Sequence, residues 1–178
     1  METMYCKLLA IGDYGVGKSS LTMRFAHDKF ASFIDNNTLD DNLFKTVNLS
    51  SQVIQLEILD TGGQELFRTL GASCYRGVHG FLLVFDVTNK DSFCALDKHL
   101  ANINAFGLKA PKKPYVILVG NKCDLESERV IDFETGKHKA EELCLEYMET
   151  SPKLSINVEE VFIKVVSEIQ HKKNMEFL

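Results

Sequence analysis

Short apolar runs alternate along this chain with longer stretches in which apolar residues recur every three or four positions. The runs predict strands at 5–11, 43–49, 53–59, 80–86, 115–119 and 146–150. The runs at 81–85 and 115–119 are apolar at consecutive positions, as is typical of strands that helices cover on both faces. The longer stretches predict helices at 17–27, 65–75, 91–105, 134–146 and 157–171.

The order of these elements predicts the fold class. Strands that alternate with helices form a mostly parallel sheet, because each helix returns the chain to the same end of the sheet. We therefore expect a three-layer α/β protein with a six-stranded, mostly parallel sheet flanked by about five helices. No repeat, linker or low-complexity segment interrupts the pattern, so residues 1–178 are expected to form a single domain.

Composition and charge exclude several kinds of protein. The 178 residues carry a net charge of −5 and no basic stripe, so nucleic acid is not an expected partner. The five cysteines include no Cys-x-x-Cys pair, which favours reduced thiols in an intracellular protein over disulfides or zinc. His79 and His99 lack ligand spacing, so we expect them on the surface or in the core. No apolar run has membrane-spanning length, and no signal peptide is recognisable.

A phosphate-binding pattern, Gly-Asp-Tyr-Gly-Val-Gly-Lys-Ser, occupies residues 12–19 between a predicted strand and a predicted helix. Its backbone N–H groups and the start of the following helix can surround an anion. We expect Lys18 to reach the β- and γ-phosphates and the Ser19 hydroxyl to bind Mg²⁺; the alternative is a glycine-rich turn that binds nothing. The expected phosphate-site residues are Asp13, Tyr14, Gly15, Val16, Gly17, Lys18, Ser19 and Ser20.

A second motif, Asn121-Lys122-Cys123-Asp124, follows the buried run at 115–119 and indicates which base is bound. It falls at the carboxyl edge of the predicted sheet, where α/β folds bind ligands. The Asp124 carboxylate can accept hydrogens from both the N1–H and the exocyclic amine of guanine, a pair that adenine does not offer. The motif therefore predicts a guanine nucleotide.

Residues 59–65, Leu-Asp-Thr-Gly-Gly-Gln-Glu, supply candidates for hydrolysis. Asp60 can hold Mg²⁺ through water, the Gly63 N–H can sense a γ-phosphate, and Gln64 can orient the attacking water. Upstream, Thr38 is the candidate second protein ligand for Mg²⁺. A solvated acidic loop is the alternative interpretation of residues 35–41.

These motifs, in this order, resemble the Ras superfamily of small GTPases over almost the whole chain, which implies a P-loop GTPase fold. Residues 75–88 resemble the Rab branch, whereas residues 38–45 are more similar to the Ras effector loop. The resemblance implies that Phe30 lies near the base and that Lys122 packs along the base and ribose. Glu-Thr-Ser-Pro-Lys at 149–153 is similar to the loop under the guanine. This similarity adds three residues to the expected base site: Ser151, Pro152 and Lys153.

The chain departs from the family pattern at four positions. Thr38 lies one residue further from Lys18 than usual, which lengthens the first switch segment, and Gly62 replaces an alanine. Tyr14 faces the γ-phosphate where Ras has glycine; its ring either turns to solvent or crowds Gln64 and an incoming arginine finger. Pro152 replaces an alanine whose N–H donates to the guanine O6 in the family, and proline has no N–H.

The resemblance implies a switch that binds GTP or GDP with Mg²⁺, hydrolyses GTP and binds effector proteins through its two switch segments. Exchange factors and GTPase-activating proteins are the expected regulators, in vesicle trafficking or signalling. One alternative is a scaffold with impaired hydrolysis, which Tyr14, Gly62 and the lengthened first switch segment favour and which Gln64 and Thr38 oppose. The other is a P-loop kinase of small molecules, in which Gln64 and the motif at 121–124 have no place. The last cysteine is Cys144, so no prenylatable tail is expected within the chain. We expect a cytoplasmic protein, on membranes only through a lipidated tail outside these residues.

Overall fold

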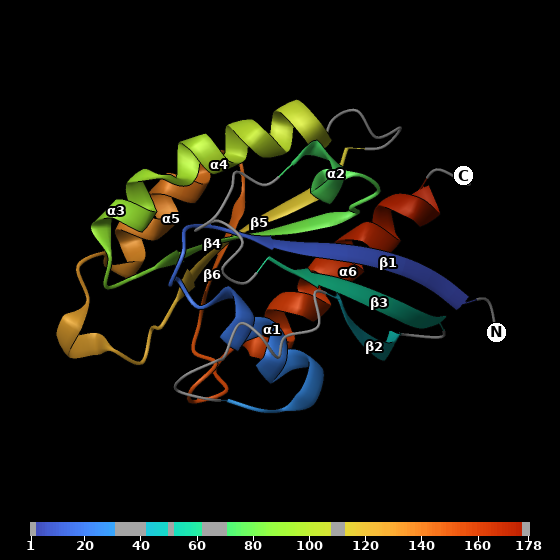
Figure 1. Cartoon of the computed structure of the whole chain (residues 1–178), viewed down its shortest axis with the longest axis horizontal. Helices are drawn as coiled ribbons and strands as arrows, with labels where there is room; N and C mark the ends of the chain where they lie inside the picture. Colours follow the sequence, from blue (N-terminus) through green and yellow to red (C-terminus); the bar gives the residue numbers. More distant parts are fainter. Residues whose placement is uncertain (1–2, 31–41, 50–51, 62–70, 108–112, 176–178) are drawn as a thin grey trace.

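One six-stranded sheet, in the order β2-β3-β1-β4-β5-β6, forms the centre of the fold (Figure 1). The computed structural model describes residues 3–30, 42–49, 52–61, 71–107 and 113–175. β2 pairs antiparallel with β3, and every other neighbouring pair is parallel, which confirms the mostly parallel sheet. The strands are β1 (Thr3–Ile11), β2 (Asn42–Leu49), β3 (Gln52–Asp60), β4 (Gly80–Asp86), β5 (Tyr115–Asn121) and β6 (Glu146–Thr150).

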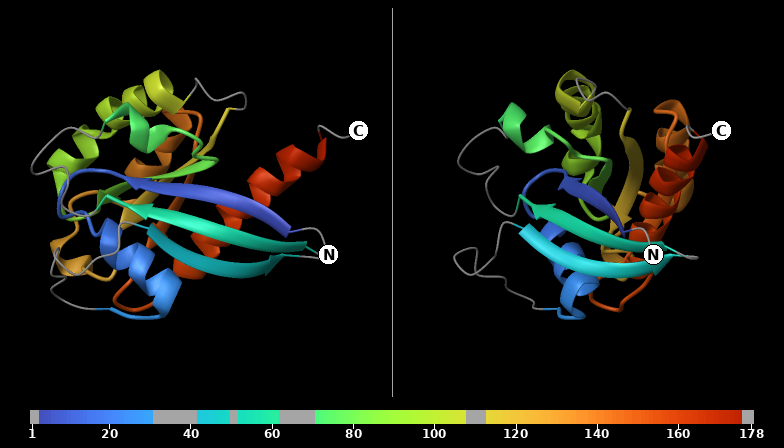
Figure 2. Two further views of the ribbon diagram at one scale, coloured as in Figure 1. Left: turned by 45° about the vertical axis from the view of Figure 1, so that its right-hand side comes forward. Right: turned by 90° about the vertical axis from the view of Figure 1, so that its right-hand side faces the viewer.

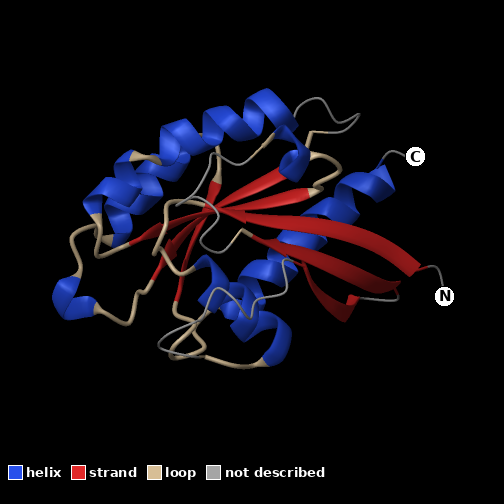
Figure 3. Cartoon of the chain, viewed as in Figure 1, coloured by secondary structure: helices blue, strands red, loops and turns tan. Residues whose placement is uncertain are grey.

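Helices cover both faces of this sheet (Figure 3). The α-helices are α1 (Lys18–His27), α2 (Ala72–Tyr75), α3 (Lys90–Cys94), α4 (Leu96–Asn102), α5 (Phe133–Glu142) and α6 (Val158–Met175). A π-helical turn (Ile103–Gly107) extends α4, and a 3₁₀ turn (Glu126–Glu128) precedes α5. The single helix predicted at 91–105 is divided at Ala95, whose ψ of −7° departs from the α-helical value. Of the helix predicted at 65–75, residues 65–70 lie outside the described residues.

Two hydrophobic layers join the helices to the sheet. α1 and α6 lie on one face of the sheet (Figure 2). There the rings of Phe25 and Phe162 stack with centroids 4.0 Å apart. α2, α4 and α5 pack on the other face around Phe81 and Phe85 of β4. Every residue of β4 is buried, as its uninterrupted apolar run predicted.

The sheet topology decides where polar chemistry can gather. β1, β3, β4, β5 and β6 run parallel to one another, so their carboxyl ends meet along one edge of the sheet. The predicted phosphate loop follows β1, Asp60 ends β3 and the predicted guanine motif begins at the end of β5. Sequence segments more than 100 residues apart therefore converge at this edge.

Candidate nucleotide-binding site

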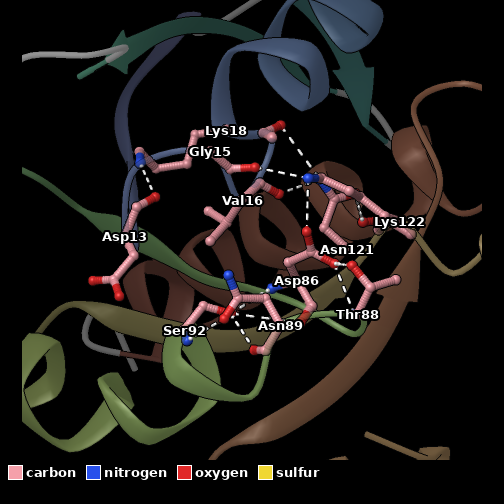
Figure 4. Close-up of polar contacts among 12 residues, drawn as sticks. Asp13, Gly15, Val16, Lys18, Asp86, Thr88, Asn89, Ser92, Asn121 and Lys122 are labelled. Carbon is pink, nitrogen blue, oxygen red and sulfur yellow. Dashed lines mark hydrogen bonds and ion pairs between the residues drawn. The ribbon is translucent and has the colours of Figure 1, made fainter. Parts of the chain in front are cut away.

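The loop between β1 and α1 has the geometry expected of a phosphate loop. Gly17 precedes the helix with φ +92°, a conformation that favours glycine. A Cβ atom on Gly17 would also collide with the side-chain amide of Asn121. The buried Lys18 amine donates to the carbonyl oxygens of Gly12 and Asp13, each at 2.8 Å. Figure 4 shows the Asp13 carboxylate turned away from this amine.

Asn121 joins the phosphate loop to the guanine motif and to β6. Its Nδ2 donates to the carbonyl oxygens of Val16 at 2.8 Å and Gly17 at 3.3 Å. Its Oδ1 accepts a hydrogen bond from the Thr150 hydroxyl at 2.9 Å. Asn121 and Thr150 are both fully buried, so one carboxamide fixes the phosphate loop, the guanine motif and the end of β6 relative to one another.

Lys122 makes a second connection between the same loops (Figure 4). Its backbone adopts φ +63°, and its amine reaches the Gly15 carbonyl oxygen at 2.7 Å and the Asp86 carboxylate at 2.6 Å. Asp86, at the end of β4, also accepts from the Thr88 backbone N–H at 2.8 Å and hydroxyl at 2.6 Å. The aliphatic part of Lys122 is thereby fixed across the site.

Asp124 lies against the loop that follows β6. Its Oδ1 accepts a hydrogen bond from the Ser151 hydroxyl at 2.6 Å, and that hydroxyl also accepts from the Leu154 N–H at 3.1 Å. Ser151 pairs through its backbone with Ile156 across the loop. The carboxylate expected to select guanine is therefore held by the loop expected to lie beneath the base.

Arg24 of α1 holds that loop from the other side. Its Nε donates to the Pro152 carbonyl oxygen at 2.7 Å, and its guanidinium also pairs with Asp28 at 3.1 Å. No described peptide bond is cis, and the N–H of a trans peptide points away from the preceding carbonyl. Arg24 therefore directs the Lys153 N–H away from α1.

Oxygen ligands suited to Mg²⁺ meet where β3 approaches α1. The Ser19 hydroxyl lies 3.0 Å from Asp60 Oδ1, and the Thr22 hydroxyl lies 3.3 Å from Asp60 Oδ2. Asp60 is buried, and a hydroxyl beside a carboxylate fits the oxygen donors that Mg²⁺ prefers. These residues fit a magnesium-bound nucleotide, with Lys18 beside them for the phosphates.

The remaining predicted residues vary in how far the structure locates them. Thr38, Gly63 and Gln64 lie outside the described residues, as does the Gly62 substitution. Tyr14 is 54% exposed, and Phe30, just after α1, is 37% exposed. Ser20 lies in the first turn of α1, and Lys153 is exposed.

A network of charged groups supports the base side of the site. Arg129 donates to both oxygens of Glu149, at 2.8 and 2.9 Å, which raises the pKa of the guanidinium. The Tyr147 hydroxyl donates to the same carboxylate at 2.8 Å; burial and this contact raise the pKa of Tyr147. Burial, with Glu149 and Asp124 nearby, also raises the pKa of the Cys123 thiol. All five cysteines are free.

Several residues that position this site had no signal in the sequence. Each of them contacts a site residue that is distant in the sequence. Thr150 contacts Asn121, 29 residues away. Arg24 contacts Pro152, 128 residues away, and His99 contacts Asp13, 86 residues away. Periodicity assigns a residue to a face of its own element and does not identify its neighbours on other elements. His99, expected to be an ordinary surface or core residue, lies 2.7 Å from the Asp13 carboxylate.

Comparisons with known proteins show the family of the chain. A sequence model of the Ras family matches residues 7–171. The chain belongs to the Ras family. It is 42% identical over 167 residues to the Ras-related protein Rab-1C of Dictyostelium discoideum, covering 94% of this chain and 82% of that protein. It is 44% identical over 168 residues to the GTP-binding protein ypt2 of Schizosaccharomyces pombe, covering 94% and 82% of the two chains.

Membership of the family assigns the general activity. The chain is a small GTPase of the Rab-like type: a GTP-binding switch that hydrolyses GTP to GDP and phosphate. Proteins of this family bind GTP or GDP with Mg²⁺, and they bind effectors, exchange factors and GTPase-activating proteins. The alternative of a scaffold with impaired hydrolysis is not favoured.

Replacing Thr150 with valine tests the Asn121 junction. Thr150→Val keeps the side-chain shape but leaves Asn121 Oδ1 without its hydroxyl donor. An unsatisfied buried acceptor costs about 1–3 kcal/mol, so the free energy of unfolding in urea should fall by about that amount. The control, Thr46→Val on the exposed face of β2, should change it by less than about 0.5 kcal/mol. Equal effects of the two substitutions would contradict the role of this hydrogen bond.

Proposed function

We propose that this chain binds GTP and GDP with Mg²⁺ through residues of its described edge loops. The observation that carries the proposal is the Asn121 carboxamide, which joins the phosphate loop to the guanine motif and to β6. Lys18 and the N–H groups of residues 13–20 bind the phosphates, and Ser19 and Asp60 serve the metal. Asp124, supported by Ser151, reads the guanine, while Lys122, Phe30 and Lys153 line the base and ribose. Residues 1–178 form one GTPase domain in this proposal.

Hydrolysis is assigned to residues expected from the sequence. Thr38 completes the metal site, Gly63 senses the γ-phosphate and Gln64 orients the attacking water, as the family pattern implies. Lys18 stabilises charge on the phosphates as the bond to the γ-phosphate breaks. In this proposal the exchange between GTP and GDP forms changes the surface that effector proteins bind.

We also propose a role in vesicle trafficking on the cytosolic face of membranes. The similarity to Rab-1C and ypt2 over more than nine-tenths of the chain supports this proposal. An exchange factor, a GTPase-activating protein and effectors that bind the switch segments are the expected partners. Among the helices that the structure describes, none combines the length and apolar character needed to cross a bilayer.

Nucleotide selectivity gives the first test. Lys18→Ala should abolish tight binding of GDP and GTP in calorimetry, since the phosphates lose their buried cation. Asp124→Ala should weaken guanine nucleotides selectively. Lys98→Ala and Asp91→Ala, which remove exposed charges of α4 and α3, are the matched controls and should bind normally. Equal affinity of the unmodified protein for ATP and GTP would contradict the guanine assignment.

Tyr14 gives a test of hydrolysis. Intrinsic hydrolysis by small GTPases is slow, on the order of 10⁻⁴ s⁻¹, and a ring over the γ-phosphate would obstruct Gln64 further. Tyr14→Gly should therefore raise the rate of phosphate release under single-turnover conditions, or restore stimulation by an activating protein. Tyr5→Ala, which removes a similarly exposed ring from β1, should leave the rate unchanged. If Tyr14→Gly changes neither quantity, the ring has turned to solvent and plays no part.

Pro152 gives a test of nucleotide retention. Restoring the missing N–H with Pro152→Ala adds a hydrogen bond to the guanine O6, worth about 0.5–1.5 kcal/mol. Release of a fluorescent GDP analogue should slow several-fold, because affinity differences between related complexes lie mostly in the off-rate. The preference for GTP over ATP should be unchanged, since Asp124 still reads the base.

Pro114→Ala is the matched control for this substitution, because Pro114 is also buried and lies in the loop before β5. It should leave the release rate unchanged. Unchanged release by Pro152→Ala as well would mean that the Lys153 N–H, oriented through Arg24, already donates to O6.

A further inference from the structure

A contact between two side chains joins the phosphate loop to α4. His99 Nε2 lies 2.7 Å from Asp13 Oδ1, and the two side chains are 15% and 41% exposed. His99 lies in α4, the second helix after β4, whereas Asp13 is the second residue of the loop that follows β1. The contact therefore connects the phosphate loop to an element outside the described nucleotide motifs.

Asp13 is held at both its side chain and its backbone. Its carboxylate faces His99, while its carbonyl oxygen accepts from the Lys18 amine at 2.8 Å. The peptide that begins with this carbonyl carries the N–H of Tyr14, and a planar trans peptide has its carbonyl and N–H on opposite sides. Fixing the Asp13 side chain and carbonyl thus fixes the direction of the Tyr14 N–H within a loop whose N–H groups bind phosphate.

We propose that His99 is a positioning residue for the phosphate loop and that its protonated form holds a bound nucleotide more firmly than its neutral form. Protonated imidazole is a cation that donates from both nitrogens, so it forms a charge-assisted hydrogen bond with a carboxylate. Loss of the proton leaves a neutral imidazole, which can still donate to the carboxylate but lacks the attraction between opposite charges. The protonated fraction of an imidazole falls as the pH rises, so nucleotide release should become faster with rising pH.

The charged groups of the surrounding elements have their own partners or face solvent. On α4 itself, Asp97 pairs with Lys139 of α5 at 3.0 Å, and Lys98 is exposed. Asp86, at the end of β4, pairs with Lys122. The two charged residues of α3, Lys90 and Asp91, are exposed. Among the residues that the structure describes, the carboxylate within hydrogen-bond distance of the His99 ring is that of Asp13.

The experiment measures release of a fluorescent GDP analogue, with Mg²⁺, from pH 5.5 to pH 8.5. The unmodified protein should release the analogue about fivefold more slowly at pH 6 than at pH 8, as expected when the attraction of a partly exposed ion pair is added to the hydrogen bond. His99→Gln retains a neutral donor and should reduce that ratio to less than about twofold. Asp13→Asn, which removes the other charge of the pair, should flatten the profile in the same way.

The matched control is His138→Gln. His138 lies on α5 and also faces a carboxylate, that of Glu141 at 3.4 Å, but it is exposed and belongs to no described contact with the phosphate loop. It should retain the full ratio of the unmodified protein. A ratio retained in His99→Gln, or an equal loss in His138→Gln, would overturn the proposal. If the role of His99 is merely structural, His99→Gln should lower the thermal midpoint of unfolding and leave the ratio of release rates between pH 8 and pH 6 unchanged.

The inference rests on nucleotide binding at the phosphate loop, and the experiment separates the two ideas. A protein that retained no GDP analogue at any pH would contradict the proposed binding site. If the unmodified protein and His99→Gln both bind the analogue and show the same pH profile, the positioning role alone would be contradicted.

Discussion

The buried carboxamide of Asn121 is the constraint on which the arrangement of this site depends. It donates to carbonyl oxygens of the phosphate loop and accepts from Thr150, and it is completely removed from solvent. Each polar group left unsatisfied there would cost about 1–3 kcal/mol, so the phosphate loop, the guanine motif and the end of β6 can move relative to one another only by breaking these hydrogen bonds. The same side chain also explains the glycine at position 17, because a Cβ atom would occupy the place of its amide.

The same kind of contact recurs along this edge of the sheet. Long cationic side chains hold backbone carbonyl oxygens: Lys122 holds Gly15, Lys18 holds Gly12 and Asp13, and Arg24 holds Pro152. Because carbonyl and N–H lie on opposite sides of a trans peptide, a carbonyl held on one side directs the neighbouring N–H to the other. These cationic side chains therefore orient backbone N–H groups that can donate to an anion or to a carbonyl oxygen of a ligand. The N–H groups are oriented before the ligand binds. Such prior organisation reduces the entropy lost on binding.

The base side of the site is supported by a second, charged layer. Arg129, Glu149 and Tyr147 form a hydrogen-bonded group on β6 and the loop before α5, and the Asn157 amide donates to the Glu149 carbonyl oxygen at 2.8 Å. This layer fixes the end of β6, from which Thr150 and Ser151 reach Asn121 and Asp124. A partly buried ion pair with both carboxylate oxygens bonded gives directional support that an exposed pair would not.

The sequence by itself determined the six strands and the α/β class, because apolar runs such as 81–85 and the stripe on α6 must be buried wherever the chain folds. It also determined the phosphate and guanine motifs, since a glycine loop before a helix and a carboxylate after a buried strand have few other uses in that order. Only the tertiary structure decided that Asn121 and Lys122 hold the phosphate loop, that Arg24 holds Pro152 and that His99 faces Asp13. The physical reason is that these contacts join elements separated by up to 128 residues. Periodicity fixes which side of an element is buried, but sheet order and helix packing decide which polar side chains then meet.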